Sequence, residues 1–263
     1  MSGVLSLKSL FNLFALALLP KRTVEQCPLC GCKAFSRFKK IRYQGLLISL
    51  VRCEKCTLVL QSPRLTEEAL ERFYATEYRL DQTDSHGRNQ YERGQRRGTY
   101  IVEYLSENGK TLGQGDTILE VGCGHGGILG HLQDVGCIVA GCDPESIATE
   151  YAKSQGLDIR HGFDDQLSDF EGKADAVVLS HVLEHVEEPI KFLSKIGRLL
   201  KSEGVIYVEV PGINNPRVVH KGYGAQLGHL VYFTEKTLRD TASAAGYEVI
   251  DANELAQSIL WKQ

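Results

Sequence analysis

The sequence lacks the features that mark a membrane-spanning or exported protein. Its longest apolar run, Val4–Leu19, is shorter than the roughly 20 residues that a spanning helix needs. A secretory signal places its basic residues before the apolar run, whereas Lys21 and Arg22 come after it. We therefore expect a cytoplasmic protein in which an amphipathic helix over residues 1–22 packs on its own protein or on a second copy. Peripheral contact of residues 4–19 with the inner face of a membrane is the open alternative.

Acidic residues are nearly absent from residues 21–64, which hold ten Lys or Arg against Glu25 and Glu54. Such a basic segment suits a phosphate-bearing acceptor, a membrane surface or nucleic acid, and a solvated surface is the alternative. The remaining chain is acidic, and the whole carries a formal charge of −3. Its 263 residues, 43% of them apolar, have room for one full α/β domain and a small appendage.

Two Cys-x-x-Cys pairs within residues 23–62 predict a zinc ribbon. Cys27 and Cys30 form one pair, Cys53 and Cys56 form the other, and 22 residues separate the pairs. Each pair occupies a tight turn that aims two thiolates at one point, and two such turns complete a tetrahedral Zn²⁺ site. Four thiolates leave no open position for a substrate, so we expect the ion to be structural. Disulfides are the alternative, but no export signal supports an oxidising compartment.

Residues 63–112 are polar, and we expect them to form a helical connector or lid. Thr66 has the position of a helix N-cap. The Gly-containing stretch 81–98 could be a mobile lid whose arginines close over a cofactor carboxylate or a substrate phosphate. A surface helix is the alternative to a lid for this stretch.

Residues 113–263 alternate strand-like and helix-like segments, which predicts a parallel sheet with helices on both faces. Ligands bind at the carboxyl ends of the strands in such sheets. The first strand, Thr117–Val121, runs into a Gly-x-Gly-x-Gly loop, and Asp143 ends the second strand. The glycines let the backbone approach a ligand closely, and Asp143 is placed to accept hydrogen bonds from ribose hydroxyls. A dehydrogenase would carry Gly-x-Gly-x-x-Gly instead.

These residues resemble the class I S-adenosylmethionine-dependent methyltransferases over about residues 115–263. Ile118–Gly126 looks like that family's first motif, Gly141–Pro144 like its second, and Ser180–Val186 like the segment after the fourth strand. The resemblance implies an α/β, Rossmann-like seven-stranded sheet with S-adenosylmethionine as cofactor. The cofactor-binding residues that it implies are Glu120, Gly122, Gly124, Gly126, Asp143, Pro144, Phe163, Asp164, Ser180 and His181.

With a zinc ribbon ahead of this domain, the chain is similar to sugar methyltransferases of polysaccharide and secondary-metabolite pathways. O-methylation of a sugar or glycan-type acceptor is therefore expected. Deoxysugar C-methyltransferases carry a Tyr-x-Glu-His cluster where this chain has Gln226-Leu227-Gly228-His229. The loss of two of its members disfavours C-methylation, which needs a base beside a carbonyl. A phenolic or quinone-type acceptor at the membrane is a further alternative, and residues 212–228 are expected to shape the acceptor pocket.

Three histidines are candidate bases for a sugar hydroxyl, because a neutral imidazole can take one proton while the acceptor is aligned with the methyl group. We expect His185 to act, with His229 and His181 as further candidates, and Glu184 to orient His185 or bind a divalent metal. A nucleic-acid methyltransferase or binding module is disfavoured, because Ser180–Leu183 stands where such an enzyme has Asn/Asp-Pro-Pro-Tyr/Phe.

Overall fold

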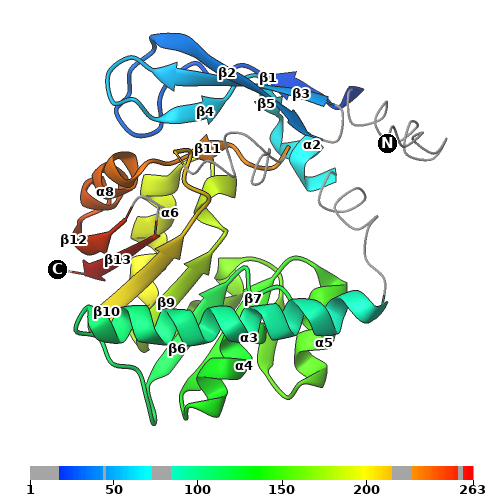
Figure 1. The fold of residues 1–263 in the computed structure, drawn as a ribbon, viewed down its shortest axis with the longest axis vertical. Coiled ribbons are helices and arrows are strands. Elements are labelled where there is room, and N and C mark those ends of the chain that lie inside the picture. Colours follow the sequence, from blue (N-terminus) through cyan, green and yellow to red (C-terminus); the bar gives the residue numbers. More distant parts are fainter. Residues whose placement is uncertain (1–17, 44–45, 73–83, 215–226, 254–256, 263) are drawn as a thin grey trace.

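The computed structural model describes residues 18–43, 46–72, 84–214, 227–253 and 257–262. Figure 1 shows a small β-rich unit above a larger α/β unit, with the long helix α3 (Asp84–Glu107) lying across the larger sheet. Most of the helix expected over residues 1–22 lies outside the described residues. At its end, Lys21–Arg22 is strand β1 instead of helix, because it pairs with β5 (Arg64–Leu65). No helix in the described part is long and apolar enough to cross a bilayer.

The larger unit is built on a seven-stranded sheet in the order β12-β13-β10-β9-β6-β7-β8. Strand β13 runs antiparallel to both of its neighbours, and the other strands run parallel to one another. The α/β sheet that the sequence predicts is therefore confirmed. The strands are β6 (Thr117–Val121), β7 (Ile138–Asp143), β8 (Asp158–His161), β9 (Ala174–Ser180), β10 (Leu200–Glu209), β12 (Tyr247–Ala252) and β13 (Gln257–Lys262).

Successive side chains of the central strands point to opposite faces of this sheet, and each face has its own hydrophobic cluster. Ile118 and Val178 belong to the cluster under α3, α4 and α5. Leu119 and Val177 belong to the cluster under α6 and α8. Besides α3, the α-helices of the described residues are α2 (Glu67–Arg72), α4 (Gly127–Asp134), α5 (Ser146–Ser154), α6 (Pro189–Ile196) and α8 (Glu235–Ala244). Thr66 caps α2 as predicted, since its Oγ1 accepts from the Ala69 N–H at 3.3 Å.

Helix α3 includes residues 84–98, for which the sequence left a lid and a surface helix as alternatives. Two of its glycines bring its backbone close to α4. A Cβ on Gly94 would lie 2.8 Å from Gly127 Cα, and a Cβ on Gly98 would lie 2.8 Å from His131 Cβ. These residues are therefore a packed helix, because close contact with α4 outweighs the low helix propensity of glycine.

The small unit is a four-stranded antiparallel sheet in the order β11-β4-β3-β2. Strand β11 (Val231–Tyr232) comes from the C-terminal half of the chain, so the ribbon is completed by a distant segment. Cys27, Cys53 and Leu60 belong to the same hydrophobic cluster as α6 and α8. The ribbon thus shares a core with the larger unit. Its own strands are β2 (Phe35–Tyr43), β3 (Leu46–Cys53) and β4 (Val59–Gln61).

Candidate active site

The turn after β6 exposes its backbone at the carboxyl end of the sheet. Gly122, Gly124 and Gly126 have φ angles of 74°, 50° and 76°, in the left-handed region that favours glycine. A Cβ on Gly122 would lie 2.6 Å from Val182 Cγ2, and a Cβ on Gly126 would lie 2.7 Å from Leu157 Cδ1. At Gly124, in contrast, no atom of the described residues outside its chain neighbours lies within 4 Å of the Cβ position. Gly124 therefore leaves room for a ligand against the backbone.

Two acids flank this loop. Asp143 Oδ2 accepts from the Gly124 N–H and its Oδ1 from the Glu145 N–H, both at 2.8 Å. Burial raises the pKa of Asp143, and these two backbone donors oppose the rise. Asp143 therefore holds the glycine loop in place, a role beyond the ribose contact that the sequence predicts.

Glu120 lies beneath the loop and is only 2% exposed. Burial raises its pKa well above the ordinary value, and the nearby charge of Asp143 adds to this rise. Among the described residues, Glu120 Oε2 has no hydrogen-bond partner. A cationic group bound beside Glu120 would favour the ionised form of its carboxyl group, and S-adenosylmethionine carries an ammonium group on its methionine part.

Three further residues expected at the cofactor follow the ends of β7 and β8. Pro144 directly follows β7, and the resemblance implies that Phe163 or Asp164 lies near the adenine. Phe163 is 65% exposed after β8, and an exposed ring can stack on a flat base. Asp164 is less exposed than Phe163, and its Oδ2 forms an ion pair with Lys195 Nζ of α6 at 2.6 Å.

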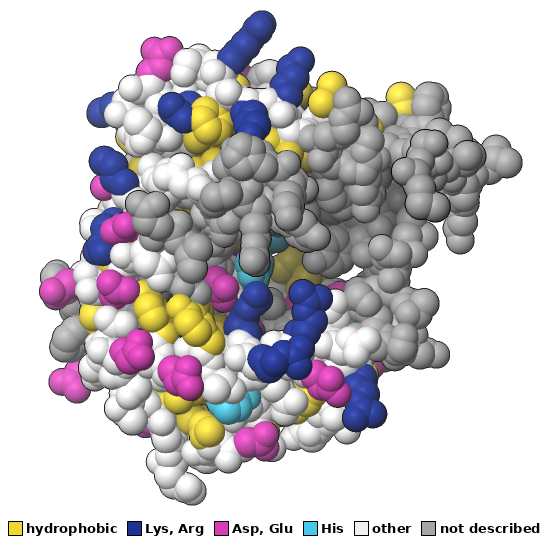
Figure 2. Space-filling model, viewed as in Figure 1, with side chains coloured by type: hydrophobic (Ala, Val, Ile, Leu, Met, Phe, Trp, Pro, Cys, Tyr) yellow, Lys and Arg dark blue, Asp and Glu magenta, His cyan; other side chains and the backbone are white. Residues whose placement is uncertain are grey.

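Arg97 of α3 reaches the carboxyl ends of β9 and β10. Its Nη1 lies 3.4 Å from Ser180 Oγ, and its Nε lies 3.4 Å from Glu209 Oε2. Ser180 Oγ also donates to Glu209 Oε2 at 3.3 Å. Figure 2 shows basic side chains gathered over α3 on this face. The sequence predicts that arginines of this helix approach a ligand, but the prediction did not include Glu209. An acidic residue at the end of an apolar strand could have indicated it.

His181 connects this group to the turn that follows β9. Its φ of 59° is uncommon outside glycine, and such strain persists only where the surroundings fix it. Its backbone N–H donates to Glu209 O at 2.8 Å. Its Nδ1 lies 3.3 Å from Glu184 Oε1, and its Nε2 lies 4.0 Å from Glu209 Oε1. His181 is thus held between two carboxylates.

The other catalytic candidates, Glu184, His185 and His229, form one cluster. Their possible ligand atoms all lie within 4.8 Å of one another. The two imidazole rings meet edge to face with centroids 4.6 Å apart, and His229 Nε2 lies 3.9 Å from Glu184 Oε1. Burial alone would raise the pKa of Glu184, but the contact with His181 and the neighbouring imidazoles outweigh it and lower that pKa. The structure therefore brings together all four catalytic candidates.

His185 lies in a short 3-10 turn, Leu183–His185, and has a defined tautomer. Its Nδ1 lies 3.0 Å from Gly228 O, and because a carbonyl oxygen only accepts, Nδ1 carries the hydrogen. Its Nε2 then presents a lone pair. Burial lowers the pKa of His185, and Glu184 opposes this shift only in part. The cluster can take a proton at Nε2, or its two imidazoles and carboxylate can hold a divalent cation.

The four cysteines predicted to bind zinc meet at one point. Cys27 Sγ and Cys56 Sγ lie 3.5 Å apart, as do Cys30 Sγ and Cys53 Sγ, and all four sulfurs lie within 4.8 Å. A tetrahedral ion with Zn–S bonds of about 2.3 Å places its sulfurs roughly 3.8 Å apart. All four cysteines are free thiols. The geometry therefore fits a zinc ion. Cys32 is outside this cluster, with its Sγ near the backbone of residue 34.

Known proteins resemble more than half of this chain. A family model described as a methyltransferase domain matches residues 91–252. The ubiquinone biosynthesis O-methyltransferase of Maricaulis maris is 31% identical over 159 residues, covering 56% of this chain and 62% of that protein. A probable S-adenosylmethionine-dependent methyltransferase of Mycolicibacterium smegmatis is 31% identical over 141 residues, covering 52% and 54%. The chain thus spans less than two thirds of the length of these curated relatives.

Solved structures show the same fold. The 1,6-didemethyltoxoflavin-N1-methyltransferase of Burkholderia thailandensis, solved with S-adenosylhomocysteine, has a TM-score of 0.55 at 15% identity, covering 79% of this chain and 95% of that one. A SAM-dependent methyltransferase from Archaeoglobus fulgidus has a TM-score of 0.51 at 17% identity, covering 63% and 94%. Because the family model covers more than half of the chain, the protein belongs to the methyltransferase-domain family.

Proposed function

We propose that the chain O-methylates a hydroxyl group of a small sugar or glycan-type acceptor. The observation that carries this proposal is the Nε2 lone pair of His185, which the Nδ1 hydrogen bond to Gly228 O fixes at the carboxyl end of the sheet. His185 takes the hydroxyl proton as the acceptor oxygen forms its bond to the methyl carbon. When bound, S-adenosylmethionine supplies an activated methyl group whose bond to sulfur breaks in that step. The proton then leaves His185 to solvent.

The cofactor is proposed to bind along the glycine loop. The open backbone at Gly124 and the buried Oε2 of Glu120 support this placement for its methionine part. Asp143 is proposed to accept from the ribose, and the exposed Phe163 to lie against the adenine. Roles for Pro144, Asp164, Ser180 and His181 at the cofactor stay predictions. The proposed roles of Glu184 and His229 are to position His181 and His185.

We infer that the four ribbon cysteines hold one structural zinc ion. The sulfur separations support this, and four thiolate ligands would leave no position for the acceptor. The ion would tie the Cys27 turn to the Cys53 turn and so fix the sheet to which β11 adds. It would take no part in methyl transfer.

A phenolic or quinone-type acceptor is the second candidate. It is favoured by the name ubiquinone biosynthesis O-methyltransferase, which relatives from Maricaulis maris and Caulobacter vibrioides carry. Both candidates need the same base and differ only in the acceptor. A screen of nucleotide-sugars, glycans and catechols with labelled cofactor distinguishes them by which class becomes labelled.

The base is tested by replacing His185. We expect His185→Gln to lower kcat at least about 100-fold while the affinity for S-adenosylhomocysteine stays unchanged. His131→Gln, in the last turn of α4, is the control and should keep normal turnover. Near-normal kcat in His185→Gln would refute base catalysis by this residue. Turnover of the zinc-loaded enzyme that required added Mg²⁺ or Mn²⁺ would instead assign the cluster to a cation.

A further inference from the structure

The strands β2 and β3 of the ribbon are strongly basic. Four Lys or Arg lie in β2 and one in β3, and neither strand contains an Asp or Glu that would offset this charge. Figure 1 shows β2 on the side of the ribbon that faces away from the larger unit. On the face drawn in Figure 2, most acidic side chains lie over the larger unit. The positive charge of the ribbon therefore lies at its outermost strand, and the methyl-transfer site does not use these residues.

A β-bulge at Phe38 decides which cations of β2 share a face of the sheet. Arg37 is paired with Val51 before the bulge, and Lys40 is paired with Ser49 after it. Val51 and Ser49 are two residues apart in β3, so their side chains lie on the same face. Because directly opposed residues of antiparallel strands share a face, Arg37 and Lys40 lie on that face as well. Without the extra residue, their spacing of three would place them on opposite faces.

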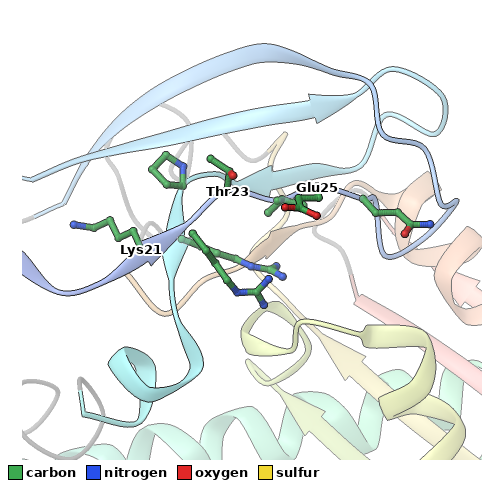
Figure 3. A pocket seen from close by; sticks show the side chains of 8 residues that line it. Lys21, Thr23 and Glu25 are labelled. Atoms are coloured by element: carbon green, nitrogen blue, oxygen red, sulfur yellow. The ribbon is translucent and has the colours of Figure 1, made fainter.

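This face keeps its positive charge. Arg37 and Lys40 are both exposed, and neither forms an ion pair with a described residue. Residues 23–61 contain two acids, Glu25 and Glu54. Glu54 directly follows β3, and Glu25 lines a pocket of about 610 Å³ next to β1 (Figure 3). Neither acid therefore neutralises the two cations.

An exposed leucine lies on the same face. Leu47 comes two residues before Ser49 in β3, and it is 60% exposed. The four residue steps from Val51 to Leu47 span about 13 Å, so the two cations and the leucine form one compact patch. Exposed apolar side chains next to cations are typical of surfaces that enter the boundary between lipid headgroups and acyl chains.

We propose that the face of β2 and β3 that carries Arg37, Lys40 and Leu47 docks on an anionic lipid bilayer. The cations attract acidic headgroups, and Leu47 gains from burial among the acyl chains. A planar bilayer can reach this face because β2 is the outermost strand, and the acidic larger unit is then turned away from the headgroups. This inference does not depend on which acceptor the enzyme methylates.

Nucleic acid fits this patch less well than a bilayer does. Binding of single strands relies on exposed aromatic rings on which bases stack. Phe35 and Phe38 of β2 instead pack against the two hydrophobic clusters that border the ribbon. The Arg52 guanidinium also covers Phe38, 4.2 Å from the centre of its ring. An exposed leucine, moreover, gains nothing from a phosphate backbone.

Vesicle cosedimentation of the full-length, zinc-loaded chain tests this surface. The probes are vesicles of phosphatidylcholine alone and vesicles that also contain phosphatidylglycerol. We expect the wild type to bind the anionic vesicles, to leave the neutral ones unbound, and to dissociate as added salt screens the charges. Arg37→Gln and Lys40→Gln should each lower the affinity about fivefold. Leu47→Ser should lower it as well, because the apolar contribution is lost.

Lys153→Gln is the matched control. Lys153 is an exposed cation in the last turn of α5, so the variant removes the same charge away from the ribbon and should keep the affinity for vesicles. An equal loss in this control would mean that only overall charge matters, which would overturn the surface. The affinity for S-adenosylhomocysteine, measured on the same samples, should match the wild type in every variant and so show that each is folded.

Three further outcomes would overturn the proposal. A wild type that binds neither kind of vesicle, or binds both equally, would exclude an anionic bilayer as the partner. Anionic vesicles that all three ribbon variants bind as tightly as the wild type would exclude this face and leave residues 4–19 as the membrane contact. A single-stranded oligonucleotide that binds the wild type and not these variants, without any vesicle binding, would assign the face to nucleic acid.

Discussion

Gly124 differs from the other glycines of its loop because it faces open space while Gly122 and Gly126 face packed side chains. We therefore expect Gly124→Ala to reduce the affinity for S-adenosylhomocysteine at least about tenfold, measured by calorimetry. Gly156→Ala is the matched control, because Gly156 also has a positive φ, 82°, and open surroundings but lies after α5. Both variants should lose about 1 kcal/mol of stability from the left-handed backbone.

The comparison separates strain from ligand contact. If Gly124→Ala and Gly156→Ala lose equal stability and both keep full cofactor affinity, the open backbone at Gly124 is not where the cofactor lies. A loss of affinity in both would point to a general loss of stability.

Glu120 makes the stability of the empty protein depend on pH. Burial raises its pKa in the folded chain above the unfolded value, so the folded chain keeps a proton that the unfolded chain has released. This contribution is fully present below the unfolded pKa of about 4.3 and is lost as the pH rises toward the folded pKa. We expect Glu120→Gln, measured by denaturant unfolding without cofactor, to gain stability relative to the wild type as the pH rises above that value. Parallel pH curves would contradict this account.

At the scale of elements, the contact between α3 and α4 depends on glycine. The Cβ of Gly94→Ala would meet the Gly127 backbone, which cannot move aside as a flexible side chain could. Alanine gains about 1 kcal/mol in helix propensity, but overpacking costs about 1–3 kcal/mol, so we expect a net loss. Thermal denaturation should show Tm lowered by about 2–4 °C for each kcal/mol lost.

The matched control for this contact is Thr99→Ala, an exposed position of the same helix. We expect this variant to keep or raise Tm, because alanine has a higher helix propensity than threonine and position 99 is exposed to solvent. A Gly94→Ala variant that is as stable as Thr99→Ala would show that α3 and α4 separate easily, which would favour the lid alternative for residues 84–98.

Elements with strong local patterns could be predicted, and elements fixed by distant partners could not. The apolar run of β6 was predicted with its observed bounds, Thr117–Val121. Strand β8 was missed because its four residues, Asp158–His161, are mostly polar and lie at the sheet edge. Strand β11 has only two residues and exists because β4 pairs with it. Local sequence holds no sign of such pairing.

The same distinction applies to the candidate site. His181, Glu184 and His185 follow one strand, so the motif predicts their proximity. Glu209 was missed because its contact with Arg97 joins residues of separate elements. The contact of Arg64 with Glu187 links the ribbon to the methyl-transfer turn, and nothing in either segment's own sequence announces it.

At the scale of the whole molecule, hydrogen bonds connect the ribbon to the catalytic turn. The Gln61 N–H of β4 donates to Leu230 O at 3.0 Å, and the Leu230 N–H donates to Glu184 O at 2.8 Å. Leu230 directly follows His229 in the chain. The strand that the cysteines stabilise therefore helps to hold two members of the Glu184, His185 and His229 cluster. The glycine loop packs against Val182 of the same turn but takes part in neither of these hydrogen bonds.

Removal of the proposed zinc should therefore impair turnover more than cofactor binding. We expect the chelated protein, and Cys53→Ser, to show a lower Tm in a single transition, because Cys53 packs in the core shared with α6 and α8. We expect kcat to fall while the affinity for S-adenosylhomocysteine changes little, since Gly124 and Glu120 are not held by the ribbon. Cys137→Ser, a buried cysteine outside the cluster, controls for the loss of a thiol. Full activity in zinc-free protein would contradict this expectation. It would mean that the Glu184, His185 and His229 cluster keeps its geometry even when the ribbon no longer holds β11.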